Sequence, residues 1–361
     1  MINKVMVAMS GGVDSSVAAQ LLVHEGKYCL EGAYIRTWQH EENFFGDCPA
    51  SKEIEDARGV AEKLGLPFRV VNLVDRYREK VVDMLVSGYQ SGITPNPDVY
   101  CNLEVKFGGF LDIAMEAGFE GVATGHYCRK RENPDGTCDI LEGIDKNKDQ
   151  SYFLALLHQD QVQHALFPVG EIEKPEVRGL ARKAGLAVAD KKDSQGICFL
   201  GKVNINEFLG ARIEDNPGEI INHHCKTVGQ HRGLHHYTIG QRKGIGVPSN
   251  TDNKAYVVTG KDYRTNTLQV AFDEPGAPIY SKQAVVGKFS FINHPIEGRT
   301  KLLAKPRYRD KSTPVELLPL QDGRTLVQFQ ETQRALAPGQ ILAIYDGETL
   351  LGGATYLGGK V

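Results

Sequence analysis

Strand-like apolar runs alternate with helical patterns through the first third of the chain, and this alternation limits the possible folds more than any other feature. The strand patterns lie at residues 4–9, 31–37, 68–73 and 121–124. The helical patterns lie at 14–25, 52–64, 76–88 and 103–117. This order predicts an α/β fold with a doubly wound parallel sheet. Ligands of such sheets bind beyond the carboxyl ends of the strands, so we expect the site there.

The pattern changes near residue 205. Residues 205–272 are rich in Gly, His, Thr and Tyr, with short β-like runs at 254–260 and 267–272. Further on, alternating segments at 285–292, 301–309, 325–329 and 340–345 are separated by turn signals such as Asp322-Gly323. We therefore expect three domains: a catalytic domain over 1–204, a small mixed central domain over 205–272, and a C-terminal antiparallel β-barrel over 273–361, with a sandwich as the alternative.

Composition places the chain among ordinary globular proteins and excludes some partners. The formal net charge of -3 excludes a globally basic nucleic-acid binder, although it permits a local basic face. Candidates for such a face are His231-Arg232, Gln241-Arg242-Lys243 and residues 299–309. No apolar run approaches the ~18 residues of a membrane helix. The apolar N-terminal stretch ends at glycines after a few residues, which indicates a strand and not a signal peptide. We expect a cytoplasmic protein with no membrane partner.

The segment Ser10-Gly11-Gly12-Val13-Asp14-Ser15-Ser16 follows the first strand pattern directly and begins a helix. Its glycines allow a tight turn that brings amides close to an anion, and a helix N-terminus favours phosphate. The alternative is an ordinary connection in which Asp14 or Ser15 caps the helix. The segment matches neither a Walker A loop nor GxGxxG. It resembles the pyrophosphate loop of the N-type ATP pyrophosphatases, which implies cleavage of ATP between the α- and β-phosphates and adenylation of a substrate oxygen.

Two of the seven cysteines lie in polar surroundings that favour reactivity. Cys101 lies just before the helix predicted at 103–117, and a helix N-terminus stabilises a thiolate. Cys198 lies in the glycine-containing segment 194–199. No CxxC pair is present, so a zinc ribbon and a thioredoxin motif are unsupported. Five histidines cluster in 223–236, but their spacing matches no standard zinc pattern, and we expect no metal site.

A resemblance to the tRNA-specific 2-thiouridylases extends along nearly the whole chain. The matching segments are AMSGGVDSS at 8–16, NPDVYCN at 96–102, TGHY at 124–127, KDQSYFL at 148–154, GICFLG at 196–201, GLHHYTIGQRKGIG at 233–246, RYR at 307–309 and RALAPGQ at 334–340. The resemblance implies ATP-dependent 2-thiolation of the wobble uridine in tRNAs of the Lys, Glu and Gln type. It also implies a persulfide donor fed by a cysteine desulfurase, directly or through a relay protein. Magnesium is expected with ATP. The chain departs from the family at Lys254-Ala255-Tyr256, where a tryptophan usually precedes the tyrosine.

The same resemblance assigns roles to individual residues. Cys101 corresponds to the nucleophile, Cys198 to the persulfide carrier, and Asp98 to a candidate general acid or base. The positions that correspond to ATP contacts are Ala8, Met9, Ser10, Gly11, Gly12, Val13, Asp14, Ser15 and Gly125. Asn96, Pro97 and Asp98 correspond to the pocket for the flipped base. Flipping costs little free energy in an anticodon loop, because the loop is already single-stranded. The tRNA-contacting positions are His126, Lys148, Asp149, Gln150, Arg307, Tyr308 and Gln340.

Three alternatives stay open at this stage. Cys101, Cys198 and a third cysteine could hold an iron–sulfur cluster, although no compact spacing supports one. The loop could serve a different adenylating ligase, such as an amidating enzyme, although no glutaminase module is visible. A non-catalytic RNA-binding protein with a β-barrel tail would leave the phosphate loop unexplained.

Overall fold

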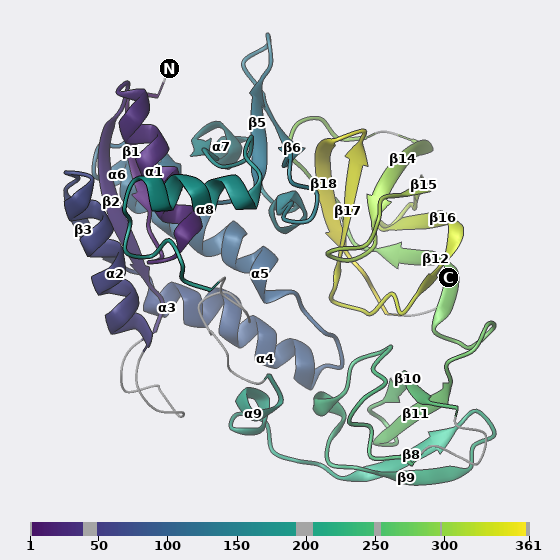
Figure 1. The fold of residues 1–361 in the computed structure, drawn as a ribbon. Helices are drawn as coiled ribbons and strands as arrows, with labels where there is room; N and C mark the ends of the chain where they lie inside the picture. Colours follow the sequence, from purple (N-terminus) through teal and green to yellow (C-terminus); the bar gives the residue numbers. More distant parts are fainter. Residues whose placement is uncertain (1, 39–48, 193–204, 249–253, 297, 359–361) are drawn as a thin grey trace.

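The computed structural model describes residues 2–38, 49–192, 205–248, 254–296 and 298–358, which form three sheets (Figure 1). The parallel sheet has the order β3-β2-β1-β4-β7. Its strands are β1 (Lys4–Ala8), β2 (Cys29–Arg36), β3 (Phe68–Asn72), β4 (Gly121–Ala123) and β7 (Ala165–Leu166). All four strand pairings are parallel, which confirms the predicted doubly wound sheet. The chain moves outward from β1 in one direction first and in the other later, so the switch point lies between β1 and β4.

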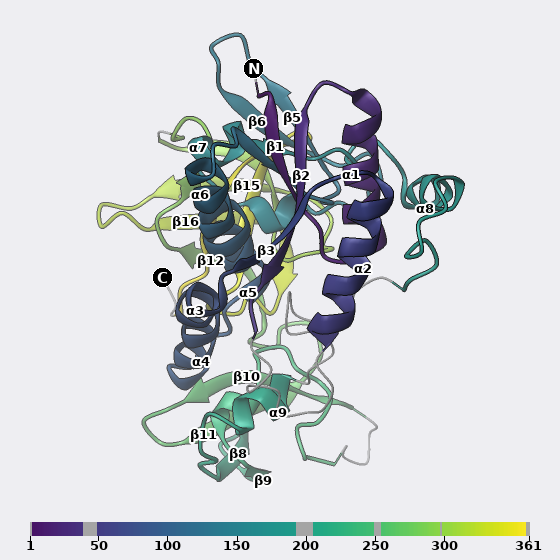
Figure 2. The same ribbon diagram turned by 90° about the vertical axis from the view of Figure 1, so that its left-hand side faces the viewer.

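Helices cover both faces of this sheet (Figure 2). One face packs against α1 (Val13–Glu25), α2 (Pro49–Lys63) and α8 (Lys174–Lys183). The other packs against α3 (Val74–Tyr77), η2 (Arg78–Val82), α4 (Asp83–Gln90), α5 (Pro97–Tyr100), η3 (Cys101–Gly109) and α6 (Phe110–Glu116). Side chains alternate along β1, with Val5 and Val7 in the first core and Met6 in the second. This two-sided burial explains why the strand reads as a continuous apolar run.

The helix predicted at 103–117 begins earlier than expected. It starts at Pro97, because the Asn96 side chain accepts a hydrogen bond from the Val99 amide (3.3 Å) and proline suits the first helical position. Helical turns then continue from α5 through η3 and α6 to Glu116. Cys101 therefore lies inside the helix, and the expectation that it precedes the helix is wrong. Its backbone N–H bonds the carbonyls of Asp98 and Pro97.

The C-terminal residues form the expected antiparallel sheet. Its strands are β12 (Tyr280–Val286), β13 (Ser290–Phe291), β14 (Thr300–Lys305), β15 (Thr313–Pro319), β16 (Thr325–Arg334), β17 (Ile341–Asp346) and β18 (Thr349–Thr355). The strand predicted at 285–292 is two strands, because the chain leaves β16 after Val286 and joins β18 at Ser290. A bridge between Val286 and Tyr356 accompanies this change of partner and closes the sheet on itself. The barrel interior holds Ala304, Val315, Val327 and their neighbours.

A hairpin from the first part of the chain extends this C-terminal sheet, and the sequence patterns did not predict it. The hairpin consists of β5 (Cys128–Glu132) and β6 (Cys138–Glu142). Strand β6 pairs with β18 through Ile140 opposite Leu350 and Leu141 opposite Thr349. After it come η4 (Ser151–Leu154) and α7 (Gln159–Gln163). The hairpin thus attaches the C-terminal barrel to the α/β region.

The central residues form a third, smaller sheet below α4 in Figure 1. Its order is β10-β11-β8-β9. The elements of this region are α9 (Ile205–Gly210), β8 (Gly218–Asn222), β9 (Thr227–His231), η5 (Leu234–His236), β10 (Tyr256–Asp262) and β11 (Thr267–Phe272). The Tyr263 hydroxyl donates to the Tyr89 carbonyl (3.0 Å), which ties this sheet to α4. Among the described residues, no helix combines the length and apolar character that a membrane crossing requires.

Candidate active site

Hydrogen bonds within the loop after β1 fix its conformation. Gly11 adopts φ +69, and a Cβ there would lie 2.5 Å from the Glu53 carbonyl oxygen, so only glycine fits. The Ser15 Oγ accepts from the Ser10 amide (3.1 Å) and donates to the Gly12 carbonyl (3.2 Å). Helix α1 begins at Val13, so its N-terminal amides and positive dipole end face the loop. This arrangement can bind a phosphate or pyrophosphate group.

A second loop, which follows β4, approaches the start of α1 at the switch point. Gly125 lies so close that a Cβ would be 2.6 Å from the Ser15 amide nitrogen and 2.7 Å from the Asp14 carbonyl carbon. The structure therefore brings Gly125 together with the 8–15 segment, as the sequence analysis expected for one site. The two loops leave adjacent strands of one sheet, where ligands of doubly wound folds bind.

Two lysines that the sequence analysis did not single out lie beside this loop. Lys174, at the start of α8, contacts the Asp14 Oδ1 (2.6 Å), which also accepts from the Tyr127 hydroxyl (2.8 Å). Lys191 donates to the Gly11 carbonyl (2.9 Å) and pairs with Asp56 (2.7 Å). They add positive charge where an anion would bind. No local motif marks them, because they approach from more than 150 residues along the chain.

The segment expected to hold the target base is partly buried. Asn96 and Cys101 are buried, with Cys101 0% exposed, whereas Pro97 and Asp98 are half-buried. The Asn102 side chain donates to the Asp98 carbonyl (3.1 Å) and stabilises the first helical turns. Cys198, the expected persulfide carrier, lies outside the described residues. The Cys101 side chain is enclosed by protein in this structure.

Residues expected to contact tRNA fall into two groups. His126 and Asp149 are buried. The His126 ring bonds the Thr124 hydroxyl (2.7 Å) and packs against Phe167, and burial lowers its pKa well below the ordinary value. Lys148, Gln150, Arg307, Tyr308 and Gln340 are half-buried. Only this second group offers surface to a large ligand in the structure described.

Tyr152 connects the segment around Asn96 with the C-terminal barrel. Its hydroxyl donates to the Ile341 carbonyl (2.7 Å) and bonds the Asn96 side chain. The Tyr308 ring lies 5.9 Å from the Tyr152 ring. Close by, the Gln340 amide donates to the Thr94 carbonyl (2.7 Å). Four segments far apart in sequence therefore meet at one place.

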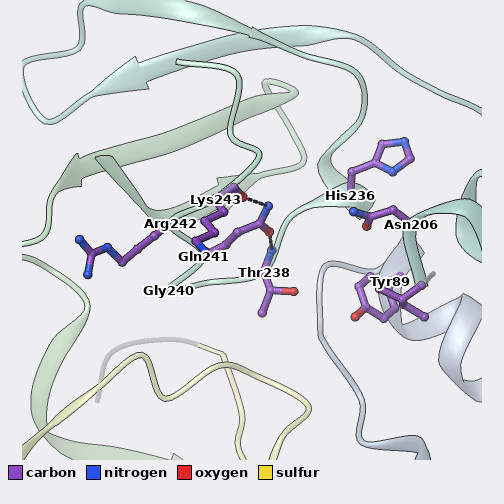
Figure 3. Close-up of a pocket in the computed structure, with 9 residues that line it drawn as sticks. Tyr89, Asn206, His236, Thr238, Gly240, Gln241, Arg242 and Lys243 are labelled. Carbon is purple, nitrogen blue, oxygen red and sulfur yellow. Dashed lines mark hydrogen bonds between the residues drawn. The ribbon is translucent and has the colours of Figure 1, made fainter. Parts of the chain in front are cut away.

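A cavity of about 410 Å³ opens between α4, α9 and residues 236–243 (Figure 3). Its lining residues are Tyr89, Ile205, Asn206, His236, Thr238, Gly240, Gln241, Arg242 and Lys243. Arg242 and Lys243 belong to the local basic face that the sequence analysis proposed. The Gln241 side chain bonds both the Thr238 amide (3.0 Å) and the Lys243 carbonyl (2.9 Å), which fixes the turn that carries the two cations.

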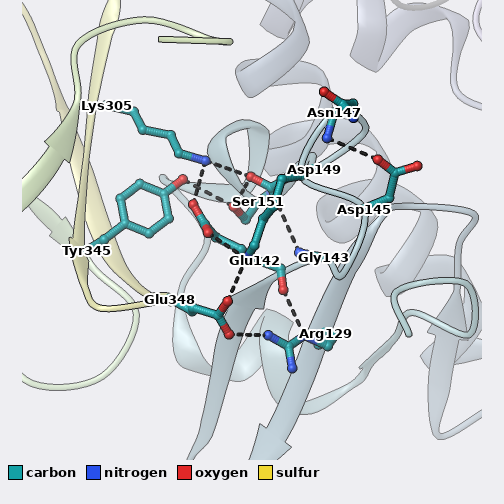
Figure 4. A network of polar contacts seen from close by, with 11 residues as sticks. Arg129, Glu142, Gly143, Asp145, Asn147, Asp149, Ser151, Lys305, Tyr345 and Glu348 are labelled. Atoms are coloured by element: carbon teal, nitrogen blue, oxygen red, sulfur yellow. Dashed lines mark hydrogen bonds and ion pairs between the residues drawn. The ribbon is translucent and has the colours of Figure 1, made fainter. Parts of the chain in front are cut away.

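Asp149 belongs to a polar network at the junction of β6 and the barrel (Figure 4). The Lys305 ammonium contacts the Asp149 Oδ2 (2.8 Å) and the Glu142 Oε1 (2.7 Å). Asp149 also accepts from the Gly143 amide (3.0 Å) and the Ser151 hydroxyl (2.9 Å). The Asp149 side chain is only 4% exposed, so its charge depends on these partners. These contacts hold the 148–151 segment in place.

The doubly wound sheet and its glycine loop define the class: a nucleotide-binding α/β domain of the HUP type. A family model described as "tRNA methyl transferase HUP domain" matches residues 3–202. Models described as "tRNA methyl transferase PRC-barrel domain" and "Aminomethyltransferase beta-barrel domain" match 206–272 and 281–356. The chain belongs to the tRNA-specific 2-thiouridylase family, since it is similar over nearly its full length to curated members.

Relatives from three bacteria illustrate this similarity. The tRNA-specific 2-thiouridylase MnmA of Akkermansia muciniphila is 49% identical, and the alignment covers 98% of each chain. The protein of the same name from Lysinibacillus sphaericus is 44% identical over 98% of this chain and 93% of its own. The Shewanella sp. (strain MR-4) protein is 42% identical over 97% and 95%. Among solved structures, the U34-tRNA thiolase NcsA from Methanococcus maripaludis is 20% identical over 53% of this chain and 60% of its own, with a TM-score of 0.34.

Proposed function

We propose that this protein uses ATP to replace the C2 oxygen of the wobble uridine in tRNA by sulfur. The observation that carries the proposal is the full-length similarity to 2-thiouridylases, together with an anion-binding loop at the switch point of the sheet. The tRNAs would be those of the Lys, Glu and Gln type. The product would be 2-thiouridine, with AMP and pyrophosphate released.

ATP would bind at the two loops that meet at the switch point. The proposed contacts are Ala8, Met9, Ser10, Gly11, Gly12, Val13, Asp14, Ser15 and Gly125. The uracil oxygen would attack the α-phosphorus, and pyrophosphate would leave toward the amides at the start of α1. Lys174 and Lys191 lie beside the loop and would stabilise the charge that develops there. Mg²⁺ would accompany ATP and neutralise the pyrophosphate.

Sulfur transfer would then use two cysteines. The terminal sulfur of a persulfide on Cys198 would attack the adenylated C2 carbon, and AMP would leave. The Cys101 thiolate would next attack the Cys198 sulfur and release 2-thiouridine, leaving a disulfide that an external thiol reduces. In the alternative order, Cys101 attacks the persulfide first and releases sulfide next to the carbon. Both orders need a persulfide donor, and both need the buried Cys101 to become accessible.

The base and the tRNA would bind where the helix start meets the barrel. Asn96, Pro97 and Asp98 would line the base pocket, with Asp98 as a general acid or base. Lys148, Gln150, Arg307, Tyr308 and Gln340 would contact tRNA. His126 and Asp149, which the resemblance also assigned to tRNA, fit better as buried supports of this surface. The central residues 205–272 would add phosphate contacts through Arg242 and Lys243.

The proposal is tested by mass spectrometry of nucleosides from tRNA incubated with the protein, ATP, Mg²⁺ and a persulfide donor. We expect Cys101→Ala and Cys198→Ala each to abolish 2-thiouridine while ATP still binds. Cys128→Ala is the matched control, because Cys128 is equally buried and burial raises its pKa well above the ordinary value. Thiolation that survives both substitutions would overturn the cysteine mechanism.

Three readouts separate the remaining alternatives. The name of the matching family model mentions methyl transfer, and a methylated nucleoside differs in mass from a thiolated one. Iron in the purified active enzyme, with its optical absorption, would favour the iron–sulfur route. Pyrophosphate release that free acids stimulate and tRNA does not would favour another adenylating ligase.

A further inference from the structure

Asp215, His235 and His236 form a cluster in the central sheet region, away from the two loops and from Cys101. Their ligand-type atoms, one for each residue, lie within 4.8 Å of one another. The Asp215 Oδ1 lies 2.6 Å from the His236 Nε2 and 3.6 Å from the His235 Nε2. Asp215 follows α9, whereas the histidines form the end of η5, so the cluster joins two separate segments.

Two ring nitrogens of this cluster, the His235 Nε2 and the His236 Nδ1, are buried without a hydrogen-bond partner among the described residues. His235 is 5% exposed, and its Nε2 makes no hydrogen bond with any described residue. This nitrogen lies on the side of the ring that faces Asp215. Leaving a polar atom buried without a partner costs free energy, so an occupant that the atom could bind would stabilise the structure.

Neighbouring contacts hold the two rings in place before any ligand arrives. The ring centroids of His235 and His236 lie 4.0 Å apart. Gly233 leaves room for the His235 ring, because a Cβ there would lie 2.7 Å from its Cε1. A neutral imidazole offers a lone pair to a metal ion.

We infer that Asp215, His235 and His236 bind a divalent transition-metal ion of the zinc type. Two imidazoles and one carboxylate suit zinc, whereas magnesium and calcium prefer oxygen ligands alone. Tetrahedral zinc places its ligand atoms about 3.3 Å apart, so binding requires only small movements from the distances seen here. Asp215 is exposed, which leaves a fourth position open to water or an anion.

Charges around the cluster limit how tightly the ion binds. Arg232 and Lys261 both act on His235 as positive charges, and they oppose a cation in the same way. We expect a dissociation constant that is roughly micromolar and not nanomolar. The bound ion would tie the segment after α9 to the wall of the cavity that carries Arg242 and Lys243 (Figure 3).

The test is titration of the full-length, metal-free protein with Co²⁺, followed by its visible absorption, and with Zn²⁺ in competition. We expect one ion per chain and a spectrum without the thiolate charge-transfer band that cysteine ligands would give. His235→Ala should weaken binding at least tenfold. Asp215→Asn changes an exposed side chain, so it should leave the fold intact and weaken binding to a similar extent.

A second pair of adjacent histidines provides the matched control. The His223 and His224 rings lie 3.8 Å apart at the same interplanar angle of 44°, but both are exposed and neither belongs to the cluster. The double variant His223→Ala/His224→Ala should bind the ion as the unaltered protein does. Absence of binding, a thiolate band, or equal affinities in the unaltered protein and Asp215→Asn would each overturn the proposal. None of these outcomes depends on whether the enzyme thiolates tRNA.

Discussion

The loop after β1 and the junction between β6 and the C-terminal barrel both depend on polar contacts, but the contacts differ in range. In the loop, Ser15 bonds residues three and five positions away. At the junction, Lys305 reaches Asp149 across 156 positions, and Arg129 reaches Glu348 across 219. The loop can therefore form as soon as β1 and α1 are in place. The junction forms only when distant parts of the chain have come together.

This difference suggests that the loop contributes mainly to the reaction and the junction mainly to the stability of the fold. The loop is short and its side-chain bonds run mainly within itself, so a change there should alter the reaction more than the fold. The Lys305 and Asp149 side chains are 13% and 4% exposed, so a change there leaves a charge in a poorly solvated place. The predictions below test this division, beginning with the largest expected effect.

Lys305→Met should lower the free energy of unfolding by about 3 to 5 kcal/mol, because Asp149 and Glu142 would lose their shared cation. Urea unfolding followed by circular dichroism measures the loss. Lys301→Met is the control, since Lys301 lies on the same strand with an exposed side chain and should cost no more than about 0.5 kcal/mol. Equal midpoints for the two variants would show that the junction is not stabilised by this charge.

Gly125→Ala should slow tRNA-dependent pyrophosphate release about 100-fold, which corresponds to about 2.7 kcal/mol in the barrier. The added Cβ would lie 2.6 Å from the Ser15 amide nitrogen, so the loop and the start of α1 must move apart. Gly59→Ala is the matched control, because no atom lies within 4 Å of its added Cβ. That variant should keep the rate and gain about 0.5 to 1 kcal/mol of stability, since alanine favours a helix. Similar rates in both variants would contradict the proposed role of the switch point.

The same contrast of range explains what the sequence predicts. Strands β1, β2 and β3 were predictable because each is an apolar run followed by a helix, a pattern contained in about 30 residues. The two-residue strand β7 was not predicted, because it is too short to give a pattern. The pairing of Ile140 with Leu350 was not predictable, because nothing in either strand identifies its distant partner. Cys101 was misplaced relative to the helix start because the Asn96 cap and Pro97 were not recognised as a helix N-terminus.

In the candidate site, too, residues of a local motif were predictable from the sequence and residues from distant segments were not. Gly11, Gly12 and Ser15 belong to one local motif, and the structure brings them to the switch point. Lys174 and Lys191 were missed because they reach the loop only after the chain has folded. A motif match also says nothing about burial: Asp149 matched a tRNA-contact position, yet its carboxylate is enclosed by protein donors.

Ser15→Ala should slow pyrophosphate release about tenfold, or about 1.4 kcal/mol, because the Ser10 amide would lose the acceptor that orients the loop. Ser16→Ala removes a hydroxyl that donates to the Gly12 carbonyl (2.7 Å) at the start of the helix. This control should change the rate less than about twofold, because the helix backbone keeps its own bonds. Equal losses would mean that the loop depends on its helical turn and not on the bond between Ser10 and Ser15.

Acid should weaken the junction, with the smallest effect of the four. Burial alone would raise the pKa of Glu142, but hydrogen bonds from Lys146 and Lys305 outweigh it and lower the pKa below the ordinary value of 4.5. A carboxyl group with a lowered folded pKa stabilises the fold above pH 4.5, and this contribution is lost as the pH falls through the folded value. Glu142→Gln should therefore be less stable at pH 7 and should lose less stability on acidification.

The acid effect should be modest because both lysines keep other partners. Lys146 retains Glu348 (2.7 Å) and Lys305 retains Asp149 (2.8 Å) when Glu142 becomes neutral. Urea midpoints measured at pH 7 and at several values below 4.5, for the unaltered protein and for Glu142→Gln, give the difference directly. Parallel curves would mean that Glu142 titrates alike in the folded and unfolded chains. In that case Glu142 would add nothing to the stability that the pair of Lys305 with Asp149 gives the junction.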